Sequence, residues 1–345
     1  MGRKSDFSVN KLYLRDNLEI LKNLPGECID LIYLDPPFFS NKNYEVLWGD
    51  ENEKRSFTDR WAGGLDYYIA WLYERVEQMR RVLKNSGSIF LHCDWHANAE
   101  IKVFILNKLF GEKNFRNEII WKRHNTHSDT KKRMPILSDT IFYYSKSERV
   151  TYNPLYEPLN EEYRKSSYRY NDDDGKGYYR SSDFTQAGQG SAKRFGDLIL
   201  EPPAGKHWIW SQDKIDEGIS QGIIILRKGK RPRLKRYLKD TKGQLIGNIW
   251  TDVLNVQSQA KERIGYPTQK PEALLERIIK MASNEGDVVL DPFMGGGTTI
   301  AVAEKLKRRW IGIDQSPRAV KVTELRLQKQ NSEKNIAEIS KEIYN

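Results

Sequence analysis

The stretch from residue 29 to residue 39 constrains the fold more than any other part of the chain. An apolar run over 29–34 ends at Asp35, Pro36, Pro37 and Phe38. Apolar residues that favour extended structure, followed by prolines, predict a buried strand ending at a rigid corner. We expect the Asp35 carboxylate, the Pro36 carbonyl and the Phe38 ring to lie together at the carboxyl end of this strand. Open α/β sheets bind their ligands at that edge.

A carboxylate beside a carbonyl and an aromatic ring suits chemistry at a planar amino group. Such a group has two N–H donors, so two acceptors can hold it while the ring stacks on the base. The sequence Asp35-Pro36-Pro37-Phe38 resembles the [DNS]-P-P-[YFW] motif of the amino-group DNA methyltransferases. In that family the target nucleotide is rotated out of the duplex into such a pocket. A strand cap followed by a Pro-Pro turn is the alternative, and the rest of the chain decides between the two.

Composition bounds the class of protein. The 345 residues suffice for one large domain or two ordinary ones. Lys and Arg outnumber Asp and Glu by 57 to 47, and the net charge of +10 favours a polyanionic partner. Cys28 and Cys93 are too few for a disulfide framework, and His92, Asp94 and His96 lack a second ligand pair, so no metal site is predicted. No apolar stretch reaches the length of a membrane span, so we expect a cytoplasmic protein without membrane association.

The amino-terminal part predicts alternating helices and strands around the Pro-Pro corner. Asp16 precedes a short apolar helix and can act as its N-cap. The polar segment 40–64 carries four aromatic residues, and we interpret it as a lid over the target base or as an unstructured surface loop. Hydrophobic spacing predicts a helix over 65–83 that ends at 85–87, a strand over 88–93, a helix over 97–110, and strands at 119–121 and 140–144.

The composition shifts between residues 151 and 250. Seven tyrosines fall between 152 and 179, and eight of the thirteen residues over 227–239 are Lys or Arg, with no acid among them. An irregular, basic and aromatic stretch is typical of a nucleic-acid-reading insertion, although a solvated basic face is the alternative. The residues expected to contact DNA are Arg227, Lys228, Lys230, Arg231, Arg233, Lys235 and Arg236.

A glycine loop lies near the carboxyl end of the chain. A buried strand over 288–291 leads into the loop 292–299, a helix over 300–306 and a strand over 310–314. Gly295 and Gly297 let the backbone approach a ligand, and Asp314, 314 − 295 = 19 residues on, suits ribose hydroxyls. The third glycine of GxGxxG is absent, and Asp291 would repel a pyrophosphate but suit an ammonium group. A βαβ turn without a ligand is the structural alternative.

Two further motifs carry the same resemblance. The loop D-P-F-M-G-G-G-T-T resembles the S-adenosylmethionine loop of the DNA methyltransferases, and Thr-Gln-Lys-Pro at 268–271 is another element of that family. In the family the acid at the position of Asp16 approaches the adenosine of the cofactor. The resemblance therefore implies S-adenosylmethionine as the cofactor, bound by Asp16, Thr268, Lys270, Asp291, Phe293, Gly295, Gly297, Thr298 and Asp314.

The order of the motifs resembles the circularly permuted β group of amino-methyltransferases. It implies a Rossmann-like α/β fold with a mixed, mostly parallel sheet and an inserted target-recognition domain. We expect the catalytic half over 1–150, the insertion over 151–250, and the cofactor-binding half with a terminal helix over 251–345.

The resemblance implies a site-specific transfer of a methyl group to the 6-amino group of adenine in double-stranded DNA by base flipping. Asp35, Pro36, Pro37 and Phe38 are the expected catalytic residues. Asp at the first motif position usually goes with adenine and Ser with cytosine, so cytosine-N4 methylation is the alternative. An RNA or protein methyltransferase and a non-catalytic DNA-binding regulator fit less well. A partner restriction endonuclease and a homodimer are both compatible with this class, and the sequence determines neither.

Overall fold

The computed structural model describes residues 8–39, 63–125, 132, 134–266 and 268–343, with side chains up to residue 332. The chain divides into two compact units. The first, here called the sheet unit, comprises Met1–Leu155 and Gly247–Asn345, and the second, the inserted unit, comprises Tyr156–Ile246. The division lies within five residues of the boundaries expected from composition. A role of the inserted unit in target recognition stays a prediction.

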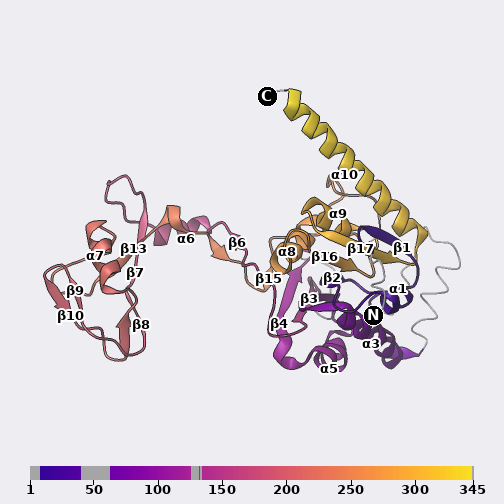
Figure 1. Ribbon diagram of the computed structural model, residues 1–345, viewed down its shortest axis with the longest axis horizontal. Helices are drawn as coiled ribbons and strands as arrows, with labels where there is room; N and C mark the ends of the chain where they lie inside the picture. Colours follow the sequence, from indigo (N-terminus) through magenta and orange to yellow (C-terminus); the bar gives the residue numbers. More distant parts are fainter. Residues whose placement is uncertain (1–7, 40–62, 126–131, 133, 267, 344–345) are drawn as a thin grey trace, which may run out of the picture. The chain divides into compact units, whose positions relative to one another are not determined.

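The sheet unit is built on an eight-stranded sheet in the order β1-β17-β16-β2-β3-β5-β4-β15 (Figure 1). All neighbouring strands pair in parallel except β5, which is antiparallel to both β3 and β4. The predicted mixed, mostly parallel sheet is therefore confirmed. The strands are β1 (Lys11–Leu14), β2 (Ile29–Leu34), β3 (Leu83–Cys93), β4 (Phe115–Lys122), β5 (Ser138–Ser145), β15 (Ile249–Trp250), β16 (Val288–Asp291) and β17 (Arg309–Asp314).

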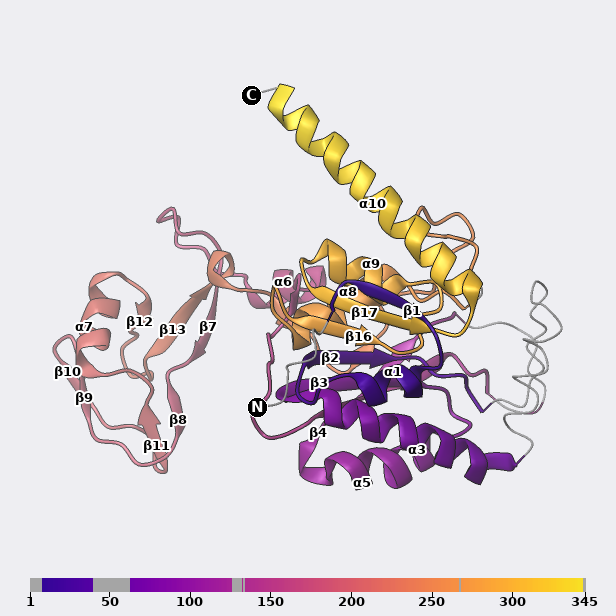
Figure 2. The same cartoon turned by 45° about the vertical axis from the view of Figure 1, so that its right-hand side comes forward.

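Helices cover both faces of this sheet (Figures 1 and 2). On one face α1 packs on α3, and α3 packs on the helical segment of η1 and α5; on the other, α8 packs on α9 and α9 on α10. The amphipathic pattern explains α3, because its periodic apolar side chains, among them Leu72, Val76 and Met79, are fully buried. The helices are α1 (Asn17–Asn23), α3 (Gly64–Val82), α4 (Asn98–Glu100), η1 (Ile101–Leu106), α5 (Asn107–Phe110), η2 (Glu112–Asn114), α8 (Glu272–Ala282), α9 (Thr298–Lys305) and α10 (Pro317–Ile343).

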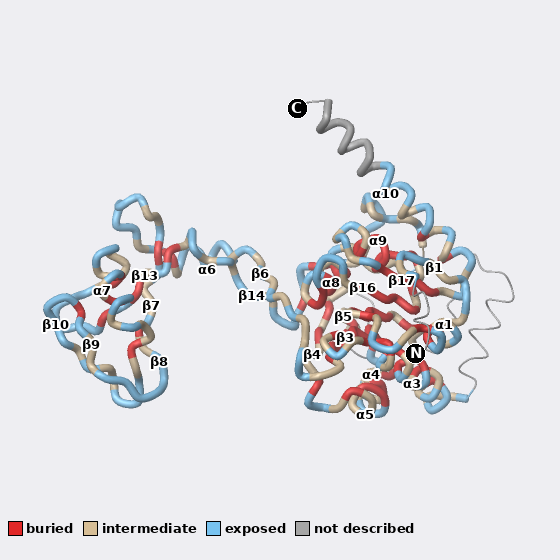
Figure 3. Tube along the Cα trace, in the orientation of Figure 1, coloured by how far each residue is buried: buried red, intermediate tan, exposed pale blue. Residues whose placement is uncertain are grey.

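The core follows the central strands (Figure 3). Leu31, Ile32 and Leu34 of β2 have no exposed surface, and the ring of Phe90 on β3 stacks on Tyr143 of β5 at 4.3 Å between centroids. Strands buried on both faces read as continuous apolar runs, which is why these segments were recognisable in the sequence. Because β2 and β16 are neighbours, the Pro-Pro corner and the glycine loop begin at the same edge of the sheet.

Two expectations about local structure need adjustment, and a third is not tested. The long helix ends at Val82, and the residues 85–87, which were expected to stop it, already belong to the irregular start of β3. The helix expected over 97–110 contains the π-helical turn η1 between two short α-helical pieces. The segment 40–62, interpreted as a lid or a surface loop, lies outside the described residues.

The inserted unit has its own small core. Six buried side chains, Phe184, Phe195, Trp208, Ile215, Ile224 and Leu234, pack together there. Its two ends are hydrogen-bonded to each other, because β6 pairs with β14 next to the points where the chain enters and leaves. Its elements are β6 (Tyr156–Glu157), α6 (Glu161–Ser167), β7 (Tyr179–Asp183), β8 (Thr185–Ala187), β9 (Lys193–Phe195), β10 (Leu198–Leu200), β11 (Lys206–Trp208), α7 (Gln212–Ser220), β12 (Ile224–Ile225), β13 (Arg233–Tyr237), η3 (Leu238–Asp240) and β14 (Gln244–Leu245).

No helix in the described part of the chain combines the length and the apolar composition that crossing a bilayer requires.

Candidate active site

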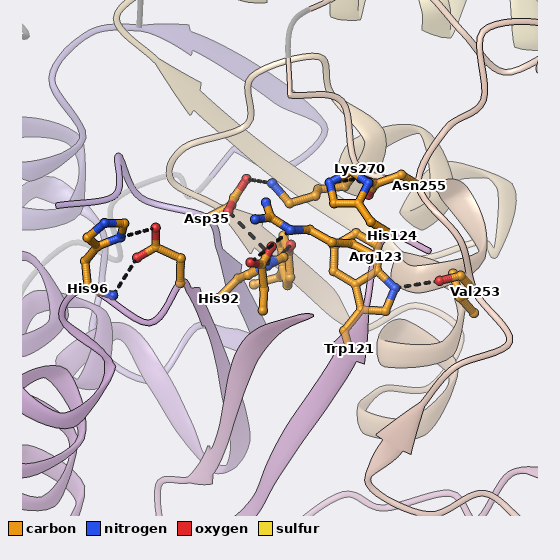
Figure 4. A network of polar contacts seen from close by, with 12 residues as sticks. Asp35, His92, His96, Trp121, Arg123, His124, Val253, Asn255 and Lys270 are labelled. Carbon is orange, nitrogen blue, oxygen red and sulfur yellow. Dashed lines mark hydrogen bonds and ion pairs between the residues drawn. The ribbon is translucent and has the colours of Figure 1, made fainter. Parts of the chain in front are cut away.

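Asp35 lies directly after β2, at the carboxyl edge of the sheet, as the sequence predicted. Its two carboxylate oxygens have different surroundings (Figure 4). Oδ2 accepts a hydrogen bond and ion pair from Lys270 Nζ. Oδ1 is buried and meets no hydrogen-bond donor among the described residues. A buried acceptor without a donor is costly unless a ligand supplies one.

The other residues of the corner lie around this carboxylate. Pro36 is buried, and Pro37 and Phe38 are partly exposed. The Phe38 ring lies 5.8 Å from the ring of His92, and the Lys270 amine lies 5.8 Å from the Phe38 centroid. The corner therefore combines an open acceptor, a cation and an aromatic face that is accessible in part.

The Thr-Gln-Lys-Pro segment joins this corner to the glycine loop. Lys270, which was expected to bind the cofactor, has its amine on Asp35, while its carbonyl accepts the Thr298 hydroxyl at 3.0 Å. The Gln269 side chain bonds the backbone of Glu262 and Ile264 at 2.7 and 3.0 Å, which holds the preceding loop. Thr268 is exposed and has a positive φ of 59°. Its expected role at the cofactor stays a prediction.

The glycine loop is hydrogen-bonded to the acid at the end of β17, the strand that follows α9. Asp314, at the end of β17, accepts the Gly295 N–H through Oδ2 at 2.9 Å and the Ser316 N–H through Oδ1 at 2.8 Å. Gly297 has a φ of 69°, and a Cβ at this position would collide with the Thr323 side chain of α10. The glycine at 297 is therefore required by both backbone conformation and packing.

Asp291 ends β16 and is 2% exposed. Burial raises the pKa of its carboxyl group to about 7, and the charges of Asp35 and Asp314 act in the same direction against the hydrogen bonds from Thr299 and Phe293. The Phe293 N–H donates to Oδ1 at 3.0 Å. A buried carboxylate that is this hard to ionise would be stabilised by a bound cation.

Asp16 and Asn17 bring α1 to the same edge. Asp16 caps the helix through the Leu18 N–H at 2.8 Å and also holds Arg75 at 2.9 Å, so the cap expected as one of its two roles is present. Asn17, which the sequence did not single out, donates to the Pro292 carbonyl at 2.9 Å. Its own Oδ1 is buried and finds no donor in the part of the chain that the structure describes.

Sequence reasoning also missed a chain of polar groups behind Asp35. His92, at the end of a strand whose following turn was expected to line the same cleft as Asp35, is fully buried between Tyr33 of β2 and Asp139 of β5. Arg123 lies 3.3 Å from Asp139 and leads toward the surface. The apolar run containing His92 was the only available signal, since a buried histidine needs polar partners. No cluster of three or more potential metal ligands occurs among the described residues.

The basic residues of the inserted unit fall into two groups. Arg227, Lys228, Lys230 and Arg231 are exposed in and beside the turn between β12 and β13. Arg233, Lys235 and Arg236 lie on β13, where Arg233 pairs with Asp183 at 2.6 Å and Lys235 pairs with Asp172. For Arg233 and Lys235, the acids that the run itself lacks are thus supplied by neighbouring segments.

Comparisons with known proteins agree on one family. The family model described as DNA methylase matches residues 29–325. The type II methyltransferase M.EcaI of Enterobacter cloacae is 31% identical over 325 residues, which cover 90% of this chain and 68% of that protein. The DNA adenine methyltransferase YhdJ of Escherichia coli is 29% identical over 310 residues, covering 89% of this chain and 79% of that protein.

A solved structure supports the fold. The cytosine-N4-specific PvuII DNA methyltransferase has a TM-score of 0.51 with 16% identity, covering 94% of this chain and 91% of that one. At this identity the likeness concerns the arrangement of helices and strands alone.

Proposed function

Because the chain belongs to this DNA methylase family, whose members modify N6 or N4 amino groups, we propose that it methylates the 6-amino group of adenine at a specific sequence in double-stranded DNA. The observation that carries the proposal is the buried Oδ1 of Asp35, which meets no hydrogen-bond donor among the described residues. An extruded base brings the N–H donors that this corner lacks.

In this proposal the corner binds and orients the amino group. Asp35 Oδ1 and the Pro36 carbonyl accept its two N–H bonds, which leaves the nitrogen lone pair directed away from both acceptors. Phe38 offers a face on which the base stacks. Lys270 balances the Asp35 charge at its other oxygen. Most of the acceleration then comes from positioning and from preorganised charge.

The residues of the glycine loop fit S-adenosylmethionine. When bound, this cofactor supplies an electrophilic methyl group. The fit rests on two features: a backbone turn that admits no side chain at Gly297, and two acceptors, Asp291 and the donor-free Asn17 Oδ1, next to Pro292. Both acceptors suit an ammonium group, and Asp314 suits ribose hydroxyls.

Cytosine-N4 methylation is the second candidate. Asp at the first position of the motif favours adenine, and one relative, 29% identical to this chain, is named an adenine methyltransferase. Phe38, where tyrosine is commoner in this motif, weakens the choice of adenine without favouring cytosine.

The inserted unit is our candidate for target recognition, through the exposed residues of the turn between β12 and β13. The StyLTI Mod subunit of a type III restriction-modification enzyme from Salmonella typhimurium is 28% identical to this chain. The alignment covers 85% of this chain and 49% of that protein. We therefore propose a cognate endonuclease as a partner, and a cytoplasmic location where such a pair would meet DNA. A homodimer is a further proposal that size measurement in solution tests.

The decisive experiment maps modified bases on a plasmid from cells that express the protein. The proposal predicts N6-methyladenine at one short sequence. N4-methylcytosine would select the second candidate, and an unmodified plasmid from cells with soluble protein would contradict both.

Asp35→Ala is the matched control for this experiment. We expect the purified variant to lose methylation by about a hundredfold or more, because a preorganised acceptor is removed. Its affinity for S-adenosylmethionine should be nearly unchanged, since the glycine loop is intact. Near-normal turnover would rule out Asp35 as the acceptor.

A further inference from the structure

A chain of buried polar groups ends beside the donor-free oxygen of Asp35 (Figure 4). Tyr33 Oη lies 2.9 Å from His92 Nδ1, and His92 Nε2 lies 3.2 Å from Asp139 Oδ2. The same Nδ1 lies 3.8 Å from Asp35 Oδ1. His92 has no exposed surface, so bulk water does not replace these partners.

The ring of His92 is held in this orientation by packing as well as by hydrogen bonds. The Phe38 ring lies against it at 5.8 Å between centroids, tilted by 44°. Trp121 presents its edge at 5.5 Å, and the Trp121 indole is itself fixed by a 2.7 Å bond from Nε1 to the Val253 carbonyl. Each ring nitrogen therefore keeps its own partner.

The surrounding charges decide which nitrogen carries hydrogen. Burial alone would raise the pKa of Asp139, but its interactions with His92, through the hydrogen bond and through charge, and then the charges of Arg123 and Lys270 lower it, so Asp139 is an anionic acceptor. Burial, with Asp35 and other carboxylates nearby, raises the pKa of Tyr33, so its hydroxyl keeps its hydrogen and can donate. Asp139 therefore needs hydrogen on Nε2, while Tyr33 donates to a bare Nδ1.

Ion pairs flank this histidine on both sides. Asp35, 3.8 Å from Nδ1, is paired with Lys270, and Asp139, 3.2 Å from Nε2, is paired with Arg123.

We infer that Asp139 and Tyr33 hold His92 as its Nε2–H tautomer, and that this keeps Asp35 Oδ1 open for the amino group of the target base. In the opposite tautomer the N–H on Nδ1 would take Tyr33 Oη, 2.9 Å away, as its acceptor and would also place its positive end 3.8 Å from Asp35 Oδ1, where it competes with the target amino group for that oxygen. His92 is thus a positioning residue that sets the hydrogen-bond polarity of the catalytic corner. The inference rests on the proposed function, because an open acceptor matters only if Asp35 receives an amino group.

The tautomer can be measured directly in the wild-type protein. NMR of protein labelled with nitrogen-15 in its five histidines distinguishes Nε2–H from Nδ1–H, and the contact with the Trp121 ring assigns His92. We expect the Nε2–H form. Hydrogen on Nδ1 in the wild-type protein would overturn the inference without any variant having to fold.

Asp139→Asn can reverse the direction of the hydrogen bond to His92 Nε2 with little change in side-chain shape. The Arg123 cation lies 3.3 Å from the position of Oδ1, at ion-pair distance, so the new amide turns its oxygen toward Arg123 and its NH2 toward His92. His92 then carries hydrogen on Nδ1. We expect kcat to fall at least about tenfold, with KM values for DNA and cofactor changed by less than about twofold. A variant that keeps the wild-type kcat, or that keeps the Nε2–H signal, would contradict the inference.

Asp94→Asn is the matched control, because it removes the same charge beside the other histidine of this strand end. Asp94 Oδ2 lies 2.7 Å from His96 Nδ1. We expect this variant to keep the wild-type kcat and the His92 signal, and an equal loss in both variants would point to general destabilisation instead. Failure of the proposed function has a different signature, since the wild-type protein itself would then not methylate DNA.

Discussion

At the scale of single residues, the carboxylate of Asp314 helps to fix the glycine loop. Both of its oxygens accept backbone N–H groups, from Gly295 and Ser316. A carboxylate oxygen can accept more than one hydrogen bond, and we propose that a bound ribose also donates to this group. The residue thus has a structural role that the structure displays and a binding role that we propose.

Asp314→Ala should weaken S-adenosylmethionine binding by roughly 1.5–3 kcal/mol, the usual contribution of hydrogen bonds to a charged group. Asp314→Asn keeps one acceptor for the Gly295 N–H and should lose less. Calorimetric titration of the cofactor into the three proteins is the measurement. Equal affinities would mean that the ribose is held elsewhere.

Asp291 couples stability to pH. Its pKa is raised by burial from 3.8 to about 7, so between these values the folded state binds a proton that the unfolded state does not. The free energy of unfolding should therefore fall as pH rises through this window, by up to about 4 kcal/mol in total. Asp291→Asn cannot ionise, so its stability relative to wild type should increase between pH 5 and pH 8. Urea unfolding of both proteins at pH 5 and pH 8 tests this. The same difference in free energy of unfolding between variant and wild type at both pH values would contradict it.

At the scale of elements, helix α10 holds the glycine loop through the side chain of Arg326. Arg326 is 8% exposed and joins Glu272 of α8 at 2.6 Å, the Thr298 hydroxyl at 3.1 Å and the Gly296 carbonyl at 3.3 Å. The helix therefore stabilises the turn that the proposed cofactor would contact.

Arg326→Ala should lower the free energy of unfolding by about 1–3 kcal/mol, because it leaves three acceptors without their donor. Cofactor affinity should fall with it. Lys321→Ala on the same helix is the control, since that side chain is 67% exposed and should change stability by about 0.5 kcal/mol or less. The measurement is urea unfolding of both variants. Comparable losses of unfolding free energy would show that Arg326 has no specific role in holding the loop.

The elements also show what the sequence could and could not predict. Asp35 and the glycine loop were found because their strands are buried on both faces and end at prolines or glycines, which are local signals. The His92–Asp139 bond joins residues 47 positions apart, and the Lys270–Asp35 pair joins residues 235 positions apart. These contacts depend on which strands become neighbours and in what register. No pattern within one segment contains that information.

At the scale of the whole molecule, the basic residues of the inserted unit differ in their surroundings: some are exposed to solvent, and others are paired with carboxylates. The exposed turn residues of the inserted unit are candidates for contacts with phosphates, whereas Arg233 and Lys235 already have carboxylate partners. The sequence alone assigned the same role to seven of the eight cations in the run over 227–239.

Replacing Arg227, Lys228, Lys230 and Arg231 with Ala should weaken DNA binding and spare the cofactor. For every phosphate that one of these side chains neutralises, its removal should reduce the slope of log K against log salt concentration by about 0.9. If a side chain reads a base instead, discrimination at one position of the target should fall by about 1–3 kcal/mol. Binding to cognate and scrambled duplexes across a salt series is the measurement.

A second quartet controls for the change in net charge. Lys22, Lys305, Lys307 and Lys321 are exposed cations of the sheet unit, and replacing them alters the charge equally. We expect a smaller change in slope. If both quartets shift it alike, the turn is only a solvated basic face, and recognition belongs to the tyrosine-rich segment that precedes it.

The pairing of β6 with β14 has an evolutionary consequence. Because the chain leaves and re-enters the sheet unit through two strands bonded to each other, the whole excursion between them behaves as one cassette. Recombination at this stalk can exchange the cassette for another of any length while the catalytic scaffold keeps its own connectivity. If the inserted unit reads the target sequence, as we propose, a new target can be acquired in a single genetic step without an intermediate in which the chemistry has been lost.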